Sequence, residues 1–339
     1  MFQTMTANET DFPQEVCAWW DRLALSCEQG DPFCCGSAWQ LAYHETMGGP
    51  GRRVCVRAES CSLLILTETI TASGTTVLTP LESGWLYGTQ MLGADAVRLL
   101  AEMLPEIRSE YGTIPDIALG GISPSSEAAH DLFRYFSDEY DFFRIGSALP
   151  CAASLSGGLD GFLSRRSGNF RAKLKKTLRK AQERGISVAD PAPGTDTEAD
   201  AVFERILSIE ARSWKGLSNN GMNEEPYRSF YGALLRRLVR TGQARVLFAR
   251  ADDADIGYIF GGMLGPHYRG QQFSFDAKWK AYSVGNLLQT EQISRLCESG
   301  NCFLYHMGSK SGDKMLYKNH WTELTFPMET WLMRIKSES

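Results

Sequence analysis

The stretch Phe273–Leu288, FSFDAKWKAYSVGNLL, carries the signals that decide the fold of the second half of the chain. Phe273 and Phe275 alternate with polar neighbours, as in a strand, whereas the apolar residues from Leu287 onward recur at helical spacing. Ser283–Asn286 lies at the join and predicts a turn that begins a helix. Small residues there leave backbone N–H groups open to an anion such as a pyrophosphate, although they also form ordinary helix caps.

Length and composition indicate a globular protein with room for two domains. The chain has 339 residues, of which 43% are hydrophobic and 22% charged, so neither disorder nor a fibrous repeat is indicated. No window approaches 18 consecutive apolar residues, and residues 1–12 have no apolar core. We therefore expect no membrane span and no signal peptide, and a cytoplasmic location.

The cysteines support neither a metal site nor a disulfide framework. There are nine, an odd number, without a CxxC pair or a histidine at ligand spacing. They are expected to serve as small buried apolar residues in a reducing compartment. The sequence thus predicts no metal cofactor and no catalytic thiol.

Positive charge is concentrated in one segment. Residues 161–185 contain nine Lys or Arg residues and one Glu, a net charge of +8, whereas the whole chain has −5 and the remainder therefore −13. The apolar residues of the segment fall on one stripe, which predicts a basic amphipathic helix. Its cationic face is either a solvated surface or a site for an anionic ligand.

The order of the predicted elements divides the chain near residue 150. The first half reads as two helices (14–29 and 37–47), three strands (53–57, 62–68 and 75–81), a helix (94–111), a strand (117–120) and a helix (125–136). After the basic helix, the second half reads as a strand (186–189), helices at 198–213 and 226–241, strands at 244–249, 255–264 and 268–276, a helix at 285–298 and strands at 302–307 and 322–332. We expect an N-terminal domain over 1–150 and a C-terminal domain over 151–339.

Two helices, three antiparallel strands, a phosphate-type turn, a helix and a further strand resemble the GNAT acyltransferases. That family has the motif Q/R-x-x-G-x-G/A at the turn, and this chain has Lys280-Ala281-Tyr282-Ser283-Val284-Gly285, with lysine at the first position and serine at the first glycine. The resemblance implies that the pyrophosphate of coenzyme A binds there. The residues that it assigns to the donor are Lys280, Tyr282, Ser283, Val284, Gly285 and Asn286.

Within that superfamily, the chain resembles the FemAB-like branch, including acetyltransferases associated with polysaccharide and cellulose biosynthesis. Ile209–Lys215, Phe275–Leu288, Tyr305–Gly308 and the pair Tyr317-Lys318 carry the resemblance, and the basic helix also fits. For the first half, the analogy implies a second, degenerate GNAT-like unit. The expected fold class is mixed α/β, with two tandem GNAT-like units that each have a mainly antiparallel sheet flanked by helices.

Four residues are candidates for catalysis. Asp276 ends a predicted strand beside the turn and could act as a base, or it could be a turn cap. His306 on a strand is a further candidate for proton transfer, with a core histidine as the alternative. Glu210 at a helix end is another candidate. Lys318 is the candidate cation for an anionic substrate group or a developing oxyanion. In Fem-type enzymes the matching aromatic–lysine pair, here Tyr317 and Lys318, lies at the acceptor site.

Arg212, Trp214 and Tyr317 complete the expected substrate site. The function that follows is transfer of an acyl group, acetyl above all, from acyl-CoA to an amine or hydroxyl of a sugar, polysaccharide precursor or small metabolite. A Fem-type transferase that uses aminoacyl-tRNA is the first alternative, and a non-enzymatic protein that binds an anionic ligand through the basic helix is the second. The acceptor, the acyl length and the oligomeric state stay open.

Overall fold

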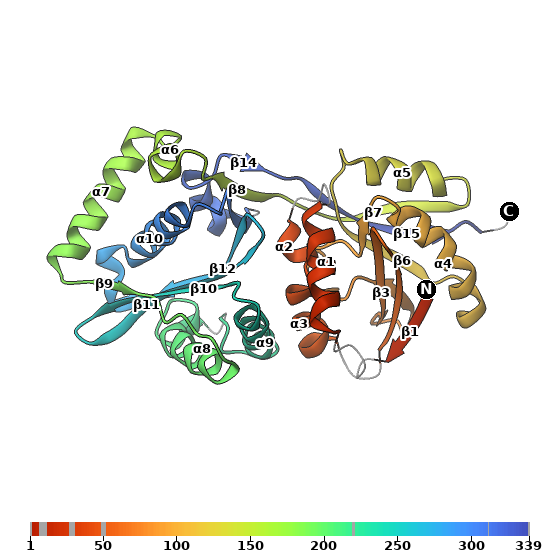
Figure 1. Cartoon of the computed structure of the whole chain (residues 1–339), viewed down its shortest axis with the longest axis horizontal. Coiled ribbons are helices and arrows are strands. Elements are labelled where there is room, and N and C mark those ends of the chain that lie inside the picture. Colours follow the sequence, from red (N-terminus) through yellow and green to blue (C-terminus); the bar gives the residue numbers. More distant parts are fainter. Residues whose placement is uncertain are drawn as a thin grey trace. The chain divides into compact units, whose positions relative to one another are not determined.

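The computed structural model describes residues 2–6, 12–26, 31–48, 52–218, 221–310 and 312–337. The chain forms two compact units, one of residues 1–150 with 326–339 and the other of residues 151–325 (Figure 1). None of the helices in the described ranges is long and apolar enough to cross a membrane.

The first unit is built on a mainly antiparallel sheet with the order β1-β2-β3-β4-β6-β15-β7, and β5 pairs with β3. Only β4 and β6 are parallel among the pairings of this sheet that the described residues form. The strands are β1 (Phe2–Thr6), β2 (Arg53–Glu59), β3 (Ser62–Ile70), β4 (Thr76–Thr79), β5 (Met91–Gly93), β6 (Asp116–Ile122), β7 (Tyr140–Ala148) and β15 (Met328–Ile335). The helices are α1 (Gln14–Ser26), α2 (Pro32–Cys35), α3 (Ser37–Met47), α4 (Ala96–Tyr111) and α5 (Glu127–Phe136).

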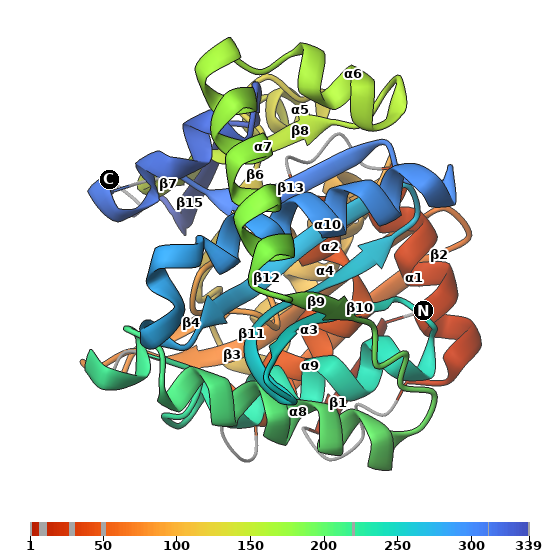
Figure 2. The same ribbon diagram turned by 90° about the vertical axis from the view of Figure 1, so that its left-hand side faces the viewer.

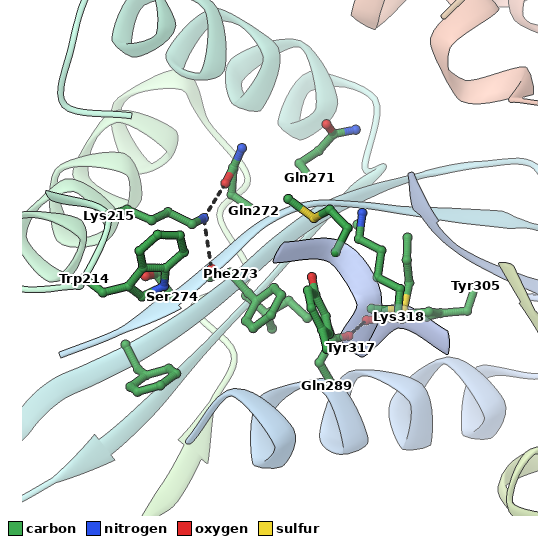
Figure 3. Close-up of a pocket in the computed structure, with 15 residues that line it drawn as sticks. Trp214, Lys215, Gln271, Gln272, Phe273, Ser274, Gln289, Tyr305, Tyr317 and Lys318 are labelled. Atoms are coloured by element: carbon green, nitrogen blue, oxygen red, sulfur yellow. Dashed lines mark hydrogen bonds between the residues drawn. The ribbon is translucent and has the colours of Figure 1, made fainter. Parts of the chain in front are cut away.

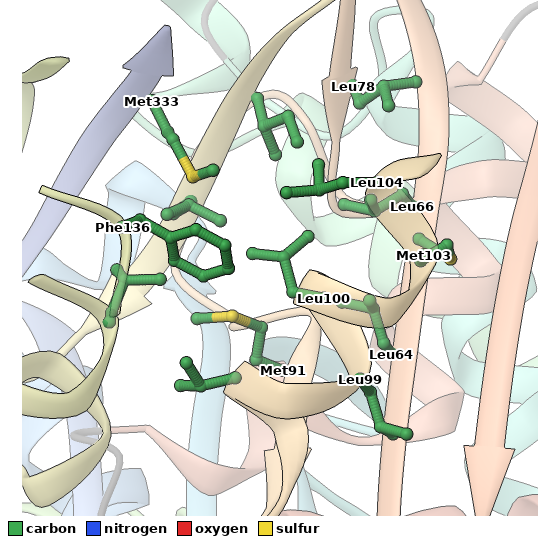
Figure 4. Close-up of a cluster of buried hydrophobic side chains, with 14 of the residues drawn as sticks. Leu64, Leu66, Leu78, Met91, Leu99, Leu100, Met103, Leu104, Phe136 and Met333 are labelled. Carbon is green, nitrogen blue, oxygen red and sulfur yellow. The ribbon is translucent and has the colours of Figure 1, made fainter. Parts of the chain in front are cut away.

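The core of this unit lies between α4 and the sheet (Figure 4). Leu100 and Met103 of α4 are fully buried with Leu64 and Leu66 of β3. Met333 of β15 belongs to the same cluster. Burial of such side chains stabilises the fold by roughly 1.5–3 kcal/mol each.

Strand β15 corrects the expected domain boundaries. The sequence placed residues 322–332 as one last strand of a C-terminal domain that ended at 339. The structure divides this region into β14 (Leu324–Thr325), which pairs with β8, and β15, which lies between β6 and β7 of the first sheet. The alternating apolar residues of β15 pack into the first core, so the chain returns to the first unit after completing the second.

The second unit has a sheet with the order β14-β8-β13-β12-β11-β10-β9. Its other strands are β8 (Pro150–Ser154), β9 (Ser187–Ala189), β10 (Ala244–Ala251), β11 (Ala254–Leu264), β12 (His267–Phe275) and β13 (Leu304–Ser309). Helices α8 (Asp196–Ala211) and α9 (Tyr227–Arg240) cover one face, and α7 (Gly168–Glu183) and α10 (Val284–Ser299) cover the other (Figures 1 and 2). The expected fold class, a mixed α/β chain with two mainly antiparallel sheets flanked by helices, is confirmed.

The basic segment forms two helices rather than one. Helix α6 (Gly158–Ser164) ends before Arg165, and α7 begins after Ser167, whose hydroxyl accepts a hydrogen bond from the N–H of Phe170 at 3.2 Å. A serine N-cap stabilises a helix start by about 1 kcal/mol. The cap therefore fixes where the cationic helix α7 begins.

Candidate active site

Strands β12 and β13 run in parallel at one end and part at the other. Registered pairs join residues 267–269 of β12 to residues 304–306 of β13, and β12 continues beyond them. The N–H of Asp276 donates to the Ile256 carbonyl in β11 at 2.9 Å. Successive residues of a strand direct their N–H and C=O groups to opposite sides, and Phe273 lies three residues before Asp276. The N–H and C=O groups of Phe273 therefore face away from β11, toward the gap beside β12.

Two adjoining cavities open at this gap. The first, of about 350 Å³, is named here the lysine cavity because Lys215 and Lys318 line it (Figure 3). The second, of about 290 Å³, is named the turn cavity because residues at the start of α10 line it. The two cavities share four wall residues, which are Phe273, Phe275, Gln289 and Tyr317.

The shared wall is held by contacts between its own members and their neighbours. The hydroxyl of Tyr305 donates to Oε1 of Gln289 on α10. The rings of Phe273 and Tyr317 meet edge to face with centroids 5.9 Å apart. Burial raises the pKa of Tyr317 to about 12, so this phenol keeps its proton at neutral pH.

Lys215 follows helix α8 and enters the lysine cavity from that face of the sheet (Figure 3). Its Nζ donates to Oε1 of Gln272 at 2.8 Å and to the carbonyl oxygen of Phe273 at 3.3 Å. Burial lowers the pKa of Lys215, and the negative charge of Glu210 opposes that shift. The ammonium is therefore partly desolvated and held beside the exposed backbone of β12.

Lys318 lies on the 3-10 segment Asp313–His320 and reaches the same cavity. It is 7% exposed, and its Nζ donates to the carbonyl oxygen of Ser309 at 2.6 Å. Burial, with the positive charges of Arg269 and Lys215, lowers its pKa to about 8. This cavity thus contains two ammonium groups close enough for their charges to interact.

The turn at Ser283 adopts a conformation that favours glycine. Ser283 has φ 54° and ψ 42°, in the left-handed region, and it precedes the first residue of α10. The N–H groups of Asn286 and Leu287 donate back to its carbonyl oxygen. The N–H groups of Val284 and Gly285 have no carbonyl acceptor within α10, because they lie in its first turn.

Not every residue expected at the donor turn lines the turn cavity. Lys280, Ser283, Gly285 and Asn286 line it, together with Lys173 of α7. A Cβ on Gly285 would lie 3.0 Å from the Phe273 ring, so this position accommodates a close approach. Val284 and Tyr282 instead pack with the apolar cluster beneath the turn, and neither lines the turn cavity.

The basic residues of the segment 161–185 fall into two groups. Several are neutralised: Arg165 and Arg166 pair with Glu323, Arg179 with Glu183, and Arg184 with Asp252. Within the described part of the chain, Arg171, Lys173, Lys175 and Lys176 form no ion pair. Lys173, Lys176 and Lys180 share one face at helical spacing, and Nζ of Lys180 lies 3.3 Å from the carbonyl oxygen of Ala281 beside the turn.

Asp276 and Arg212 are placed differently from the prediction, because they bind each other. Nε of Arg212 lies 3.0 Å from Oδ2 of Asp276, whose Oδ1 accepts from the N–H of Lys278 at 3.0 Å. The remaining Arg212 donors bind Ser208 and the carbonyl oxygen of Asp255. Neither side chain lines a cavity at the gap. The pair fixes the segment that leads to the turn. These contacts are those of a turn cap, the alternative role considered for Asp276.

Glu210 is fully buried and outside both cavities. Its Oε2 accepts from the hydroxyls of Tyr258 at 2.9 Å and Ser213 at 3.3 Å. The Ser213 hydroxyl in turn accepts from the N–H of Lys215 at 3.1 Å. Glu210 therefore acts on the site through Lys215 rather than on a substrate.

His306 faces away from the lysine cavity. Tyr305 and Met307 line it, and the side chain between them points to the opposite face of β13. Nε2 of His306 lies 3.1 Å from Nδ1 of His267. The buried histidine is thus a core residue and not a base for a substrate in this cavity.

Trp214, Tyr317 and Lys318 are the expected residues that do line the lysine cavity. The sequence analysis did not select Lys215 and Gln289 as site residues. Lys215 lies within the segment Ile209–Lys215, which carries part of the family resemblance, so that resemblance could have identified it. Gln289 is five residues after Val284 in the apolar run of α10, where a buried polar residue marks a functional wall.

Comparison with known families matches residues 168–319 to the model of the acetyltransferase (GNAT) domain. The matched residues, all within the second unit, are similar to a GNAT-type acetyltransferase domain. A search of curated proteins finds no match. The parting strands, the turn before α10 and the shared wall all lie within the matched residues.

Solved structures share the fold over the whole chain. FemX has a TM-score of 0.67 at 10% identity, with 98% of this chain and 97% of that chain covered. A conserved protein of unknown function from Bacteroides thetaiotaomicron VPI-5482 has a TM-score of 0.64 at 11% identity, with 99% of each chain covered. L-PGS from Bacillus licheniformis has 0.58 at 13% identity, with 97% and 93% covered. At these identities the likeness concerns the fold alone.

Proposed function

We propose that the second unit transfers an acyl group, acetyl above all, from acyl-CoA directly to an amine or hydroxyl of an acceptor. The supporting observation is the shared wall of Phe273, Phe275, Gln289 and Tyr317 between the turn cavity and the lysine cavity. A donor in one cavity and an acceptor in the other would meet at this wall. Holding two reactants in this way supplies much of the rate enhancement in a direct transfer.

The turn cavity fits the phosphates of coenzyme A. The first-turn N–H groups of α10 and the lysines Lys173 and Lys280 present positive charge at one place. The absence of a side chain on Gly285 lets the Phe273 ring, part of the shared wall, pack against the start of α10. A thioester arm that runs from this turn along Phe273 and Phe275 would bring its carbonyl to the gap beside β12.

Two groups are suited to stabilise the oxyanion that forms when the acceptor attacks. The N–H of Phe273 faces the gap, and the ammonium of Lys318 lies in the cavity beside it. Preorganised donors of this kind commonly account for about 3–4 kcal/mol of barrier lowering each. Among the described residues, no carboxylate or imidazole lines the lysine cavity, so we assign removal of the acceptor proton to water.

The mouth of the lysine cavity favours a carbohydrate acceptor. Trp214 is half exposed there, and Met315 and Gln271 lie on the same lining. An exposed indole face beside amide and ammonium groups suits the apolar and hydroxyl faces of a sugar ring. This supports an amino sugar or polysaccharide precursor as the acceptor.

The test combines donor binding with turnover. Calorimetry should show acetyl-CoA binding that Lys280→Met weakens several-fold and that Lys278→Met, an exposed lysine outside both cavities, leaves unchanged. Release of free thiol should require an amine or hydroxyl acceptor. Absence of acetyl-CoA binding, together with no thiol release across an acceptor panel, would refute the proposal.

A Fem-type transfer from aminoacyl-tRNA is the second candidate. The lysines at positions 173, 176 and 180 run beside the turn on one face of α7, as a phosphate backbone would require. Co-purification of tRNA at low salt, with consumption of aminoacyl-tRNA but not of acetyl-CoA, would favour this candidate. Replacement of Lys173, Lys175, Lys176 and Arg179 by Gln should abolish RNA binding and preserve the fold. If ligand binding occurs without any transfer, the non-enzymatic alternative holds.

A further inference from the structure

The lysine cavity has more positive charge than acyl transfer alone requires. Its charged lining residues, among those described, are Lys215 and Lys318, and the positive charge of Arg269 adds to theirs by lowering the pKa of Lys318. One oxyanion brings one negative charge, which Lys318 and the Phe273 N–H meet in the proposed reaction. Lys215 then has no anion to bind within the cavity.

The buried acid nearest to Lys215 does not neutralise it. The Glu210 carboxylate accepts hydrogen bonds from Tyr258 and Ser213 and none from the Lys215 ammonium. The pKa of Lys215 stays below its usual value despite the Glu210 charge, since the cost of burial exceeds the attraction. A ligand anion would supply the missing compensation.

Two residues that line the cavity have a donor without an acceptor, Lys215 and Ser274. Two of its three N–H bonds are used, by Gln272 and the Phe273 carbonyl, and one is left over. The hydroxyl of Ser274 is 2% exposed, lines the cavity and has no hydrogen-bond partner in the described structure. Ser274 is two residues from Gln272 on the strand, so both side chains lie on the face that Lys215 approaches. A buried hydroxyl left without a partner costs about 1–3 kcal/mol.

We propose that the acceptor of this acyl transfer carries a carboxylate or phosphate group, and that Lys215 and Ser274 bind that group. The inference rests on the proposed function in one respect, namely that the bound molecule is the acceptor of the acyl group. The binding of an anion beside Lys215 is independent of the donor. Lys318 acts on the reacting carbonyl, and Lys215 selects which molecule presents its amine or hydroxyl to it.

The experiment compares probes that share one amine and differ in charge. Glucosamine, glucosamine 6-phosphate and muramic acid are titrated by calorimetry into the full chain, with inorganic phosphate as a fourth probe. We expect at least one anionic amino sugar to bind about tenfold or more tightly than glucosamine, the value of one charge-assisted hydrogen bond. Whether phosphate or carboxylate is preferred distinguishes the two sources of negative charge.

Variants assign the binding to the residues. Lys215→Met should remove the preference for the anionic probe, and Ser274→Ala should reduce it several-fold while leaving the fold intact. Lys278→Met should change neither. The same titrations in a Lys173→Met/Lys280→Met background ensure that phosphate in the turn cavity is not counted.

Three results would overturn the inference. They are equal affinity for glucosamine and both anionic sugars, a preference that survives Lys215→Met, and no binding of any anionic probe. Acetyl-CoA binding is measured separately. Loss of donor binding with retained anion binding would refute the proposed function and leave this site, whereas the reverse would refute only the site.

Discussion

Nε of Arg212 lies 3.0 Å from Oδ2 of Asp276, and the second oxygen of that carboxylate caps the turn by accepting the N–H of Lys278. The strand that carries Phe273 is thereby tied to the end of helix α8. The side chain that the sequence favoured as a base thus contacts residues of the scaffold on both of its oxygens.

Replacement of Asp276 should therefore affect stability more than catalysis. Asp276→Ala should lower the free energy of unfolding by about 1–2 kcal/mol, through loss of the cap and of an ion pair in which Asp276 is buried and Arg212 partly exposed. Its kcat should stay within a few-fold of wild type, whereas removal of a general base costs about 10²–10⁴-fold. Asp276→Asn, which retains an oxygen for Lys278, should recover part of the stability. A hundredfold fall of kcat in a folded Asp276→Asn protein would restore the catalytic role.

Two substitutions of Glu210 should distinguish the effect of its charge from the effect of its hydrogen bonds. Glu210→Gln keeps an oxygen for Tyr258 and Ser213 but removes the charge that raises the pKa of Lys215. The pKa of Lys215 should then fall further, and anion binding at neutral pH should weaken with little loss of stability. Glu210→Ala leaves the two hydroxyls without their acceptor and should lower the free energy of unfolding by about 2–5 kcal/mol. Urea denaturation and probe titration measure the two effects, and equal destabilisation by Gln and Ala would contradict this interpretation.

Ser283 should be improved by glycine. A residue with a Cβ in the left-handed region costs about 1 kcal/mol, and Ser283 has φ 54°. Ser283→Gly should raise the urea midpoint, with a gain of up to about 1 kcal/mol, and Ser283→Ala should leave it nearly unchanged because the Cβ remains. Acetyl-CoA affinity of the glycine variant should be equal to or above that of wild type. A lower midpoint for Ser283→Gly would show that the serine hydroxyl stabilises the turn.

Lys318 should make stability depend on pH in the alkaline range. Its pKa is about 8 in the folded chain, against an ordinary value of 10.5. Below pH 8 both states bind the proton, and between about 8 and 10.5 only the unfolded state does, so the free energy of unfolding rises with pH across that window. The difference between wild type and Lys318→Met, measured by urea denaturation at pH 7, 8, 9 and 10, should move in favour of wild type. A constant difference would indicate that the ammonium is solvated.

Local patterns predicted most of the second unit. The period-two pattern of Phe273 and Phe275 and the helical spacing after Leu287 correspond to β12 and α10. The family motif placed Lys280, Ser283, Gly285 and Asn286 at the turn, where all four line one cavity. These signals are local, and their geometry follows from the backbone alone.

Long-range relationships were not visible in the sequence. Nothing local shows that Arg212 and Asp276 bind each other, 64 positions apart. The strand alternation at Tyr305 and Met307 did contain the orientation of His306, but only knowledge of which face opens to the cavity makes it useful. The role of Lys215 could not be predicted for the same reason, because it depends on the end of α8 lying beside the gap at β12.

The position of β15 also governs the order in which the molecule can be completed during synthesis. The second unit needs nothing beyond residue 325, whereas the first sheet lacks the strand between β6 and β7 until residues 328–335 have emerged from the ribosome. The segment synthesised first is therefore the last to close. Until then, two strand edges of the first unit stay open to wrong partners. Within the inserted unit, the pairing of β14 with β8 holds together the two chain segments that lead back to the first sheet.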